Sequence, residues 1–152
     1  MAFGFVSKKP GWFTKGDLLE HSKLTWSDGH LNMTWQLILT LMLLGHLVSD
    51  YTLQGWLADG KQKKWWQKIC GGEIPNKYKH DYIAALICHS LYWSIFICAP
   101  FYESPCFLVA VVVNAAIHSV VDDLKANRMK LNLIHDQLLH LGQILITFII
   151  LI

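Results

Sequence analysis

Four long stretches of the chain contain no Asp, Glu, Lys or Arg, and most of their residues are apolar. A helix that crosses a bilayer needs about 20 predominantly apolar residues, at a rise of roughly 1.5 Å each. The pattern therefore predicts an all-α, polytopic membrane protein built as a bundle of four transmembrane helices. With their flanking residues, these helices are expected at about 31–54, 80–102, 104–125 and 134–152.

The first 30 residues show a different pattern, in which aromatic side chains are mixed with lysines. They contain no apolar core of the 7–15 residues that a secretion signal requires. Such a mixture suits a segment that lies along a membrane surface, and a loosely ordered tail is the alternative. The sequence thus predicts two parts, an N-terminal amphipathic or tail segment at 1–30 and a four-helix domain at 31–152.

Composition narrows the class of protein. Of the 152 residues, 53% are hydrophobic and 16% are charged, which excludes an intrinsically disordered chain. The cysteines form no CxxC pair, so a disulfide scaffold is not expected, and a net charge of +2 gives no argument for a nucleic-acid partner. A soluble four-helix bundle is the alternative architecture, but so small a chain has too little polar surface for it. The expected partner is the lipid bilayer, and the sequence defines no oligomeric state.

Lysine and arginine residues are unevenly distributed among the expected connections. The loop at 55–79 holds six of them and the loop at 124–133 holds three, whereas the N-terminal segment holds four. Cytoplasmic loops of membrane proteins carry the excess of positive charge. The two basic loops are therefore expected in the cytoplasm, and both termini outside.

Histidine and aspartate residues interrupt the apolar stretches in a regular way. They lie at the C-terminal ends of the first and third stretches and at the N-terminal ends of the second and fourth. Because consecutive membrane helices alternate in direction, all of these residues are expected on one side of the bilayer. Three pairs are separated by four residues, which places both side chains on one helical face: His46 with Asp50, His118 with Asp122, and Asp136 with His140.

Imidazoles and carboxylates that meet in one pocket are typical ligands of zinc, manganese or iron. We therefore predict a site for one or two divalent metal ions, to which His89 is the natural fourth contributor. We assign proton transfer to His89 or a non-ligating Asp, and phosphate binding to Lys125 together with Lys61 or Lys64. Hydrogen bonding between helices is the alternative role for such residues, above all for His89. The predicted metal ligands are His46, Asp50, His118, Asp122, Asp136 and His140.

Four strings carry a family resemblance: GHLVSDYTLQ at 45–54, KHDYIAALICHSLYW at 79–93, AIHSVVDDLK at 116–125 and HDQLLH at 135–140. Together they resemble an uncharacterised integral-membrane family of bacteria and phages, over roughly residues 40–150. The chain departs from the family pattern at Tyr51, where Phe is usual. The resemblance implies four helices in a bacterial inner membrane but no activity. It picks out His46, Asp50, Gln54, Lys61, His89, His118, Asp122, Lys125, Asp136, Gln137 and His140.

The leading functional hypothesis is a metal-dependent hydrolase that acts on a phosphate-bearing lipid or lipid-linked substrate at the cytoplasmic face. A metal ion would supply a nucleophilic water at neutral pH. The alternatives are a transporter or relay for divalent cations or protons, haem binding by paired histidines, and a non-enzymatic phage or bacterial membrane protein that contacts a partner. The carboxylates beside each histidine pair disfavour haem.

Overall fold

The computed structural model describes residues 25–27 and 30–152, and the expectations for the earlier part of the N-terminal segment lie outside this range. The chain divides into two compact units, Met1–Leu37 and Ile38–Ile152. In the first unit, the strands β1 (Thr25–Ser27) and β2 (His30–Asn32) pair antiparallel. The pattern of apolar residues did not predict this short hairpin, which includes residues that we expected to begin the first helix.

The first long helix, α2 (Trp35–Leu47), follows the hairpin. The Thr34 Oγ1 atom accepts a hydrogen bond of 3.2 Å from the Leu37 N–H, which satisfies one of the free donors at the helix start. After Leu47 the chain continues as one turn of π-helix, η1 (Val48–Thr52). Such wide turns are rare and occur frequently at functional sites. This turn carries Asp50, one of the predicted metal ligands.

The chain between the π-helical turn and the last helix forms two short helices and two long ones. The basic loop folds into α3 (Leu57–Gly60), α4 (Lys63–Ile69) and the 3-10 turn η2 (Asn76–Tyr78). The chain then forms α5 (Asp81–Cys98), which runs into the 3-10 turn η3 (Ala99–Phe101), and α6 (Phe107–Ala126).

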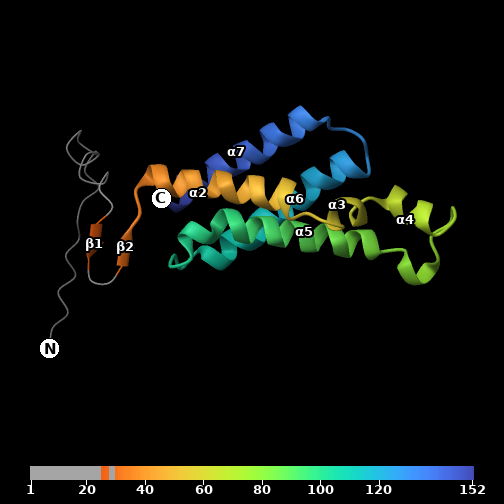
Figure 1. Cartoon of the computed structure of the whole chain (residues 1–152), viewed down its shortest axis with the longest axis horizontal. Helices are drawn as coiled ribbons and strands as arrows, with labels where there is room; N and C mark the ends of the chain where they lie inside the picture. Colours follow the sequence, from red (N-terminus) through yellow and green to blue (C-terminus); the bar gives the residue numbers. More distant parts are fainter. Residues whose placement is uncertain (1–24, 28–29) are drawn as a thin grey trace. The chain divides into compact units, whose positions relative to one another are not determined.

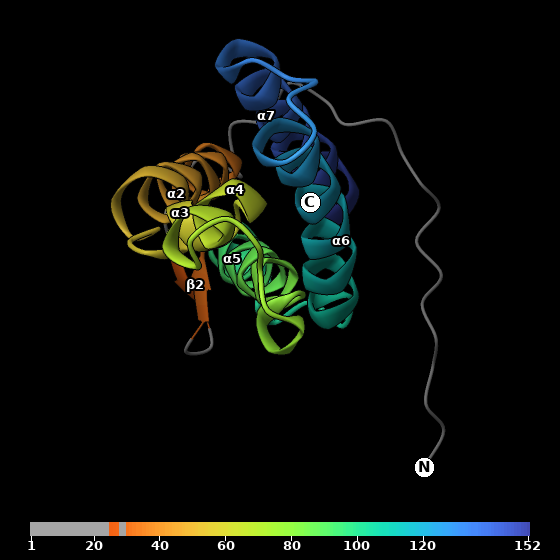
Figure 2. The same ribbon diagram turned by 90° about the vertical axis from the view of Figure 1, so that its right-hand side faces the viewer.

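The last helix is α7 (Leu133–Leu151). Its first turn is capped by Asn132, whose Oδ1 atom accepts a 2.9 Å hydrogen bond from the His135 N–H. The helices α2, α5, α6 and α7 lie along one another (Figure 1). Both basic loops lie at one end of this arrangement, and the C-terminus lies at the other; Figure 2 shows the first of these ends.

The expectation of four transmembrane helices is corrected to three within the part of the chain that the structure describes. The segments Asn76–Phe101, Phe107–Ala126 and Leu133–Leu151 are long and apolar enough to cross a membrane. By contrast, α2 has 13 residues, or about 20 Å at 1.5 Å per residue, against about 30 Å of bilayer hydrocarbon. It is short because β2 occupies the residues before it and the π-helical turn follows it.

The outward faces of the three long helices are apolar. On α5, exposed isoleucine and leucine side chains recur every four residues, and the exposed faces of α6 and α7 carry further valines, leucines and isoleucines. A soluble monomer rarely exposes more than a few hundred Å² of continuous apolar surface. These surfaces are therefore compatible with contact to lipid. The exposed residues of α5 are Ile83, Ile87, Leu91 and Ile95.

The interior has two distinct halves. The half nearer the C-terminus is an apolar core. The half nearer the basic loops is filled by buried histidine, aspartate and lysine side chains. The apolar core consists of Met42, Trp93, Ile97, Cys98, Phe101, Val111 and Ile144.

Two glycines give a matched test of this packing. A Cβ atom at Gly45 of α2 would lie 2.9 Å from the backbone oxygen of Phe96 in α5, whereas one at Gly142 of α7 would meet nothing within 4 Å. We expect Gly45→Ala to lower the free energy of unfolding by about 1–3 kcal/mol, because two helix backbones must separate. We expect Gly142→Ala to leave it unchanged or raise it by about 0.5–1 kcal/mol. Thermal unfolding in detergent, followed by circular dichroism, measures both, and equal effects would contradict the close helix contact.

Candidate metal centre

The structure brings the predicted site residues together in one buried cluster. The π-helical turn and the helices α2, α5, α6 and α7 each contribute, although the residues are spread over almost a hundred positions of the sequence. His89, His118, Asp136 and His140 are completely buried. We call the following residues the polar cluster: His46, Asp50, Lys61, His89, His118, Asp122, Lys125, Asp136, Gln137 and His140.

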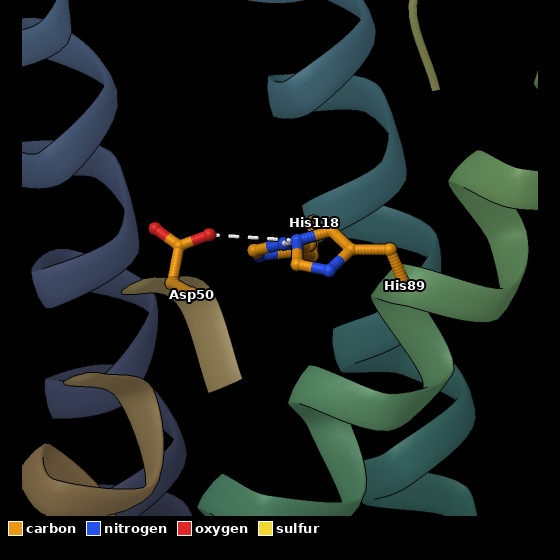
Figure 3. Close-up of side chains that lie close together, drawn as sticks. All are labelled: Asp50, His89 and His118. Carbon is orange, nitrogen blue, oxygen red and sulfur yellow. Dashed lines mark hydrogen bonds and ion pairs between the residues drawn. The ribbon is translucent and has the colours of Figure 1, made fainter. Parts of the chain in front are cut away.

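The centre of the cluster is the Nε2 atom of His89. It lies 3.4 Å from Asp50 Oδ1, 3.2 Å from His118 Nε2 and 3.3 Å from Asp122 Oδ2. Figure 3 shows the Asp50 carboxylate directed toward the two imidazoles. His118 Nε2 also lies 3.7 Å from Asp122 Oδ2. Ligand atoms about 2.0–2.1 Å from a tetrahedral zinc ion are about 3.3 Å from one another, and these four distances are close to that value.

Two overlapping groups of described residues have the spacing of a metal site. The first is Asp50, His89 and His118, and the second is His118, Asp122 and His140. A ring nitrogen has one lone pair and can bind one ion at a time. His118 Nε2 lies 3.2 Å from His89 Nε2 of the first group and 3.7 Å from Asp122 Oδ2 of the second, so this atom can serve either group but not both at once.

Several buried polar atoms of the cluster have no hydrogen-bond partner among the described residues. They include Asp136 Oδ1, both ring nitrogens of His140, and the Nδ1 atoms of His89 and His118. An unsatisfied buried polar atom costs about 1–3 kcal/mol, and most such atoms in proteins are paired. A ligand that contacts His140 and Asp136 would remove part of this cost.

Two lysines neutralise part of the negative charge. Lys61 is only 8% exposed, and its Nζ atom donates to Asp122 Oδ2 at 2.6 Å. Lys125 donates in the same way to Asp136 Oδ2. Three carboxylates and two ammonium groups leave one excess negative charge when the histidines are neutral. The cluster therefore favours one further positive charge.

The Asp50 carboxyl follows the last residue of the first apolar stretch. Burial raises its pKa, but hydrogen bonds from His89 and Gln137 outweigh this and hold the pKa well below its usual range. Gln54 also donates to Asp50 Oδ1 at 2.8 Å. Asp50 is therefore an ionised carboxylate at neutral pH, the form that a metal ion requires.

Lys61 is positioned by hydrogen bonds to the backbone of the basic loop. The side chain of Asn127, just after α6, donates to the Lys61 backbone oxygen at 3.1 Å and accepts from the Lys63 backbone N–H at 2.8 Å. The Trp66 indole donates to the Gly60 backbone oxygen at 2.7 Å. These bonds fix the backbone on both sides of Lys61, so its side chain is directed to Asp122.

A cavity of about 410 Å³ leads to the cluster from the basic end, and we call it the vestibule. Its lining combines glutamine and lysine side chains with partly exposed apolar ones. An amphiphilic ligand fits such a lining better than a purely polar or purely apolar one. The residues that line the vestibule are Asp50, Tyr51, Gln54, Ala58, Lys61, Gln62, Asp122, Lys125, Ala126, Met129, Leu131, Leu133 and Gln137.

The surroundings of two histidines bear on their predicted roles. His89, predicted to transfer protons, has its Nε2 atom among the possible ligand atoms of the first group. His46, predicted as a ligand, uses Nδ1 to accept from Trp93 at 2.9 Å and Nε2 to contact Gln137 Oε1 at 3.0 Å. Two further histidines are exposed: His80, which lies just before α5, and His135, which lies in the first turn of α7.

Trp93 was not among the predicted site residues. It is completely buried, and its ring stacks on that of His118 with centroids 4.2 Å apart. His118 in turn stacks on His140 at 4.3 Å. Its position four residues after His89, on the same helical face, was the signal in the sequence that pointed to it.

Together, the fold and the cluster define a small helical protein with three helices of membrane length and a buried His, Asp and Lys centre at one end. The chain belongs to the family described as protein of unknown function (DUF3307), whose model matches residues 38–152. The expected membership of an uncharacterised family is thereby confirmed, while a bacterial or phage origin stays a prediction. No curated protein and no solved structure matches the chain.

Proposed function

We propose that this protein is a membrane-embedded, metal-dependent hydrolase that acts on a phosphate-bearing lipid or lipid-linked substrate. The observation that carries the proposal is that two overlapping groups of His and Asp residues each place their ligand atoms within 4.8 Å of one another. The 3.2 Å between the Nε2 atoms of His89 and His118 is close to the edge of a zinc coordination sphere. Zinc, manganese and iron all accept this mixture of imidazole and carboxylate ligands.

The residues around this point support hydrolysis. A metal ion lowers the pKa of its bound water to about 7 and so supplies hydroxide at neutral pH. His140 Nε2 lies 3.6 Å from Asp122 and 3.4 Å from Asp136, a position from which it could exchange a proton with a water molecule or a leaving oxygen held beside these carboxylates. In this proposal His140 takes over the proton transfer that the sequence assigned to His89.

The vestibule supports a phosphate-bearing substrate. Lys61 and Lys125 both line it, and an ammonium group binds phosphate as a compact point charge. Both lysines are paired with carboxylates of the cluster, and binding of a divalent cation to those carboxylates would free the ammonium groups for the substrate. The apolar residues of the lining, among them Met129 and Leu133, suit the start of a lipid chain.

We propose that the basic end of the bundle, with the vestibule, faces the cytoplasm of a bacterial inner membrane. The basis is the positive-inside rule, applied to the two loops that lie together at this end. The C-terminus lies at the opposite end and would face outward.

Loss of Lys125 tests the proposed reaction. The purified, zinc-loaded protein should release inorganic phosphate from a lipid phosphate monoester or diphosphate in mixed micelles. We expect Lys125→Ala to lower kcat/KM at least tenfold, mainly through KM, because it removes a phosphate-binding charge. Lys130→Ala is the matched control, since Lys130 is exposed on the same loop. Absence of phosphate release from every lipid phosphate, by protein that retains its metal, would refute the hydrolase.

A relay for protons or divalent cations is the second candidate function. The excess negative charge of the cluster can be balanced by one proton on His140 instead of a metal ion. Polar side chains also continue into the apolar half, where Gln143 and Thr147 donate to Asn114 Oδ1 at 2.8 and 2.9 Å. The test is ion flux into proteoliposomes that contain the purified protein. A flux that is abolished by Gln143→Leu, in protein that holds no bound metal, would favour this function over hydrolysis.

A further inference from the structure

We infer that Trp93 and His46 are positioning residues, which fix the direction of the Gln137 amide and thereby decide which oxygens of Asp50 and Asp136 face the interior of the polar cluster. This goes beyond the proposed function, because it assigns a protonation state and a role to His46 whether or not a metal ion binds.

The first step is the proton of His46. The Trp93 indole N–H can only donate, and it donates to His46 Nδ1 at 2.9 Å. Nδ1 must therefore carry a lone pair, so the neutral ring carries its proton on Nε2. The two residues are 0% and 2% exposed, which leaves water little chance to compete for this bond.

The second step is the direction of the glutamine. His46 Nε2 lies 3.0 Å from Gln137 Oε1. A ring N–H needs an acceptor, so the carbonyl oxygen of Gln137 must point toward His46. Its amino group then points the other way, where it donates to Asp50 Oδ2 at 3.1 Å and to Asp136 Oδ2 at 3.0 Å. One amide thus joins carboxylates from η1 and α7.

The third step concerns the other oxygen of each carboxylate. With Oδ2 of Asp50 engaged by Gln137, Oδ1 is the oxygen that lies 3.4 Å from His89 Nε2. With Oδ2 of Asp136 engaged by Gln137 and Lys125, Oδ1 lies 3.4 Å from His140 Nε2. The glutamine therefore orients both carboxylates toward the histidines, as outer hydrogen bonds do around metal ligands.

Trp93 also packs against the imidazole rings of His118 and His46. Its ring stacks on His118 with an interplanar angle of 22°, and it meets His46 edge on with centroids 5.9 Å apart. A phenyl ring at this position would keep much of the stacking but would lack the N–H donor. The hydrogen bond and the packing can therefore be separated by experiment.

Nitrogen NMR of protein labelled with ¹⁵N-histidine tests the protonation state directly, with no metal added. We expect a neutral His46 with its proton on Nε2. In Trp93→Phe, we expect the His46 signals to move toward a mixture of the two neutral forms. Tyr92→Phe is the control, because it removes a polar atom from the adjacent residue and should leave His46 unchanged. A proton on His46 Nδ1 in the unmodified protein would overturn the inference.

Zinc affinity separates positioning from direct ligation. The His46→Gln variant retains an acceptor for Trp93 and a donor for Gln137, whereas His46→Leu retains neither. We expect His46→Leu to weaken zinc binding about 10–100-fold, and His46→Gln to restore most of that loss. Equal losses in both variants would contradict positioning and identify His46 as a ligand. If the unmodified protein binds no zinc, the proposed hydrolase fails, while the NMR experiment still decides the role of His46.

Discussion

A His118→Ala variant should bind zinc at least a hundredfold more weakly than the unmodified protein, which we expect to hold at least one ion per chain. His118 belongs to both groups of possible ligands, so its removal affects a site in either position. Loss of a residue that only orients a ligand already costs 10–100-fold, and loss of a ligand should cost more. Metal analysis and competition with a chromophoric chelator measure the stoichiometry and the affinity.

His135→Ala is the matched control for this experiment, because His135 lies exposed in the first turn of α7. It should bind zinc as the unmodified protein does. His118 is packed between the rings of Trp93 and His140, so a second variant, His118→Gln, retains more volume and tests whether an effect arises from misfolding. Unchanged zinc binding in folded His118→Ala and His118→Gln would refute the metal centre.

The free energy of unfolding of a Lys61→Ala variant should be about 3–5 kcal/mol lower than that of the unmodified protein. The variant leaves the Asp122 carboxylate, which is 1% exposed, without its ammonium partner, and an uncompensated buried charge is strongly destabilising. Thermal or denaturant unfolding in detergent, in the absence of metal, gives the change. Lys64→Ala on the same loop is the control and should have little effect, because Lys64 is exposed.

Added zinc provides an independent check on the role of this ion pair. A divalent cation bound to Asp122 would replace the missing positive charge, so we expect zinc to restore much of the stability of Lys61→Ala. The double variant Lys61→Met/Asp122→Leu should be more stable than Lys61→Ala, because it buries no unpaired charge. If the double variant is less stable than Lys61→Ala, the charge argument is wrong.

The position of the site could be predicted from the sequence, because it depends only on the four-residue spacing of the polar side chains and on the alternating direction of the helices. A separation of four residues places His118 and Asp122 on one face of α6, and the alternation of helix direction places Asp136 at the same end of the bundle. The structure agrees on both points, since all three residues lie in one cluster. The bounds of α5, α6 and α7 also follow the apolar stretches to within a few residues.

Other features depend on contacts between helices and could not be predicted from the sequence. Nothing in the composition distinguishes α2 from a membrane-spanning helix, yet a hairpin and a π-helical turn shorten it. Lys61 belongs to a loop of six lysines, and its burial could not be predicted because it depends on the distant Asn127. The roles of His46 and Trp93 depend on one hydrogen bond between α2 and α5, which no pattern within a single helix can indicate.

The division of the cluster among η1, α5, α6 and α7 has a consequence for biosynthesis. A ribosome-bound chain that has emerged only as far as α6 carries Asp50, His89 and Asp122, but not yet Gln137, Asp136 or His140. Until the last helix is added, Asp50 lacks the hydrogen bond from Gln137 and Asp122 lacks its contact with His140. Completion of the pocket therefore requires the C-terminal helix, and chains that end before it should be substrates for quality-control proteases.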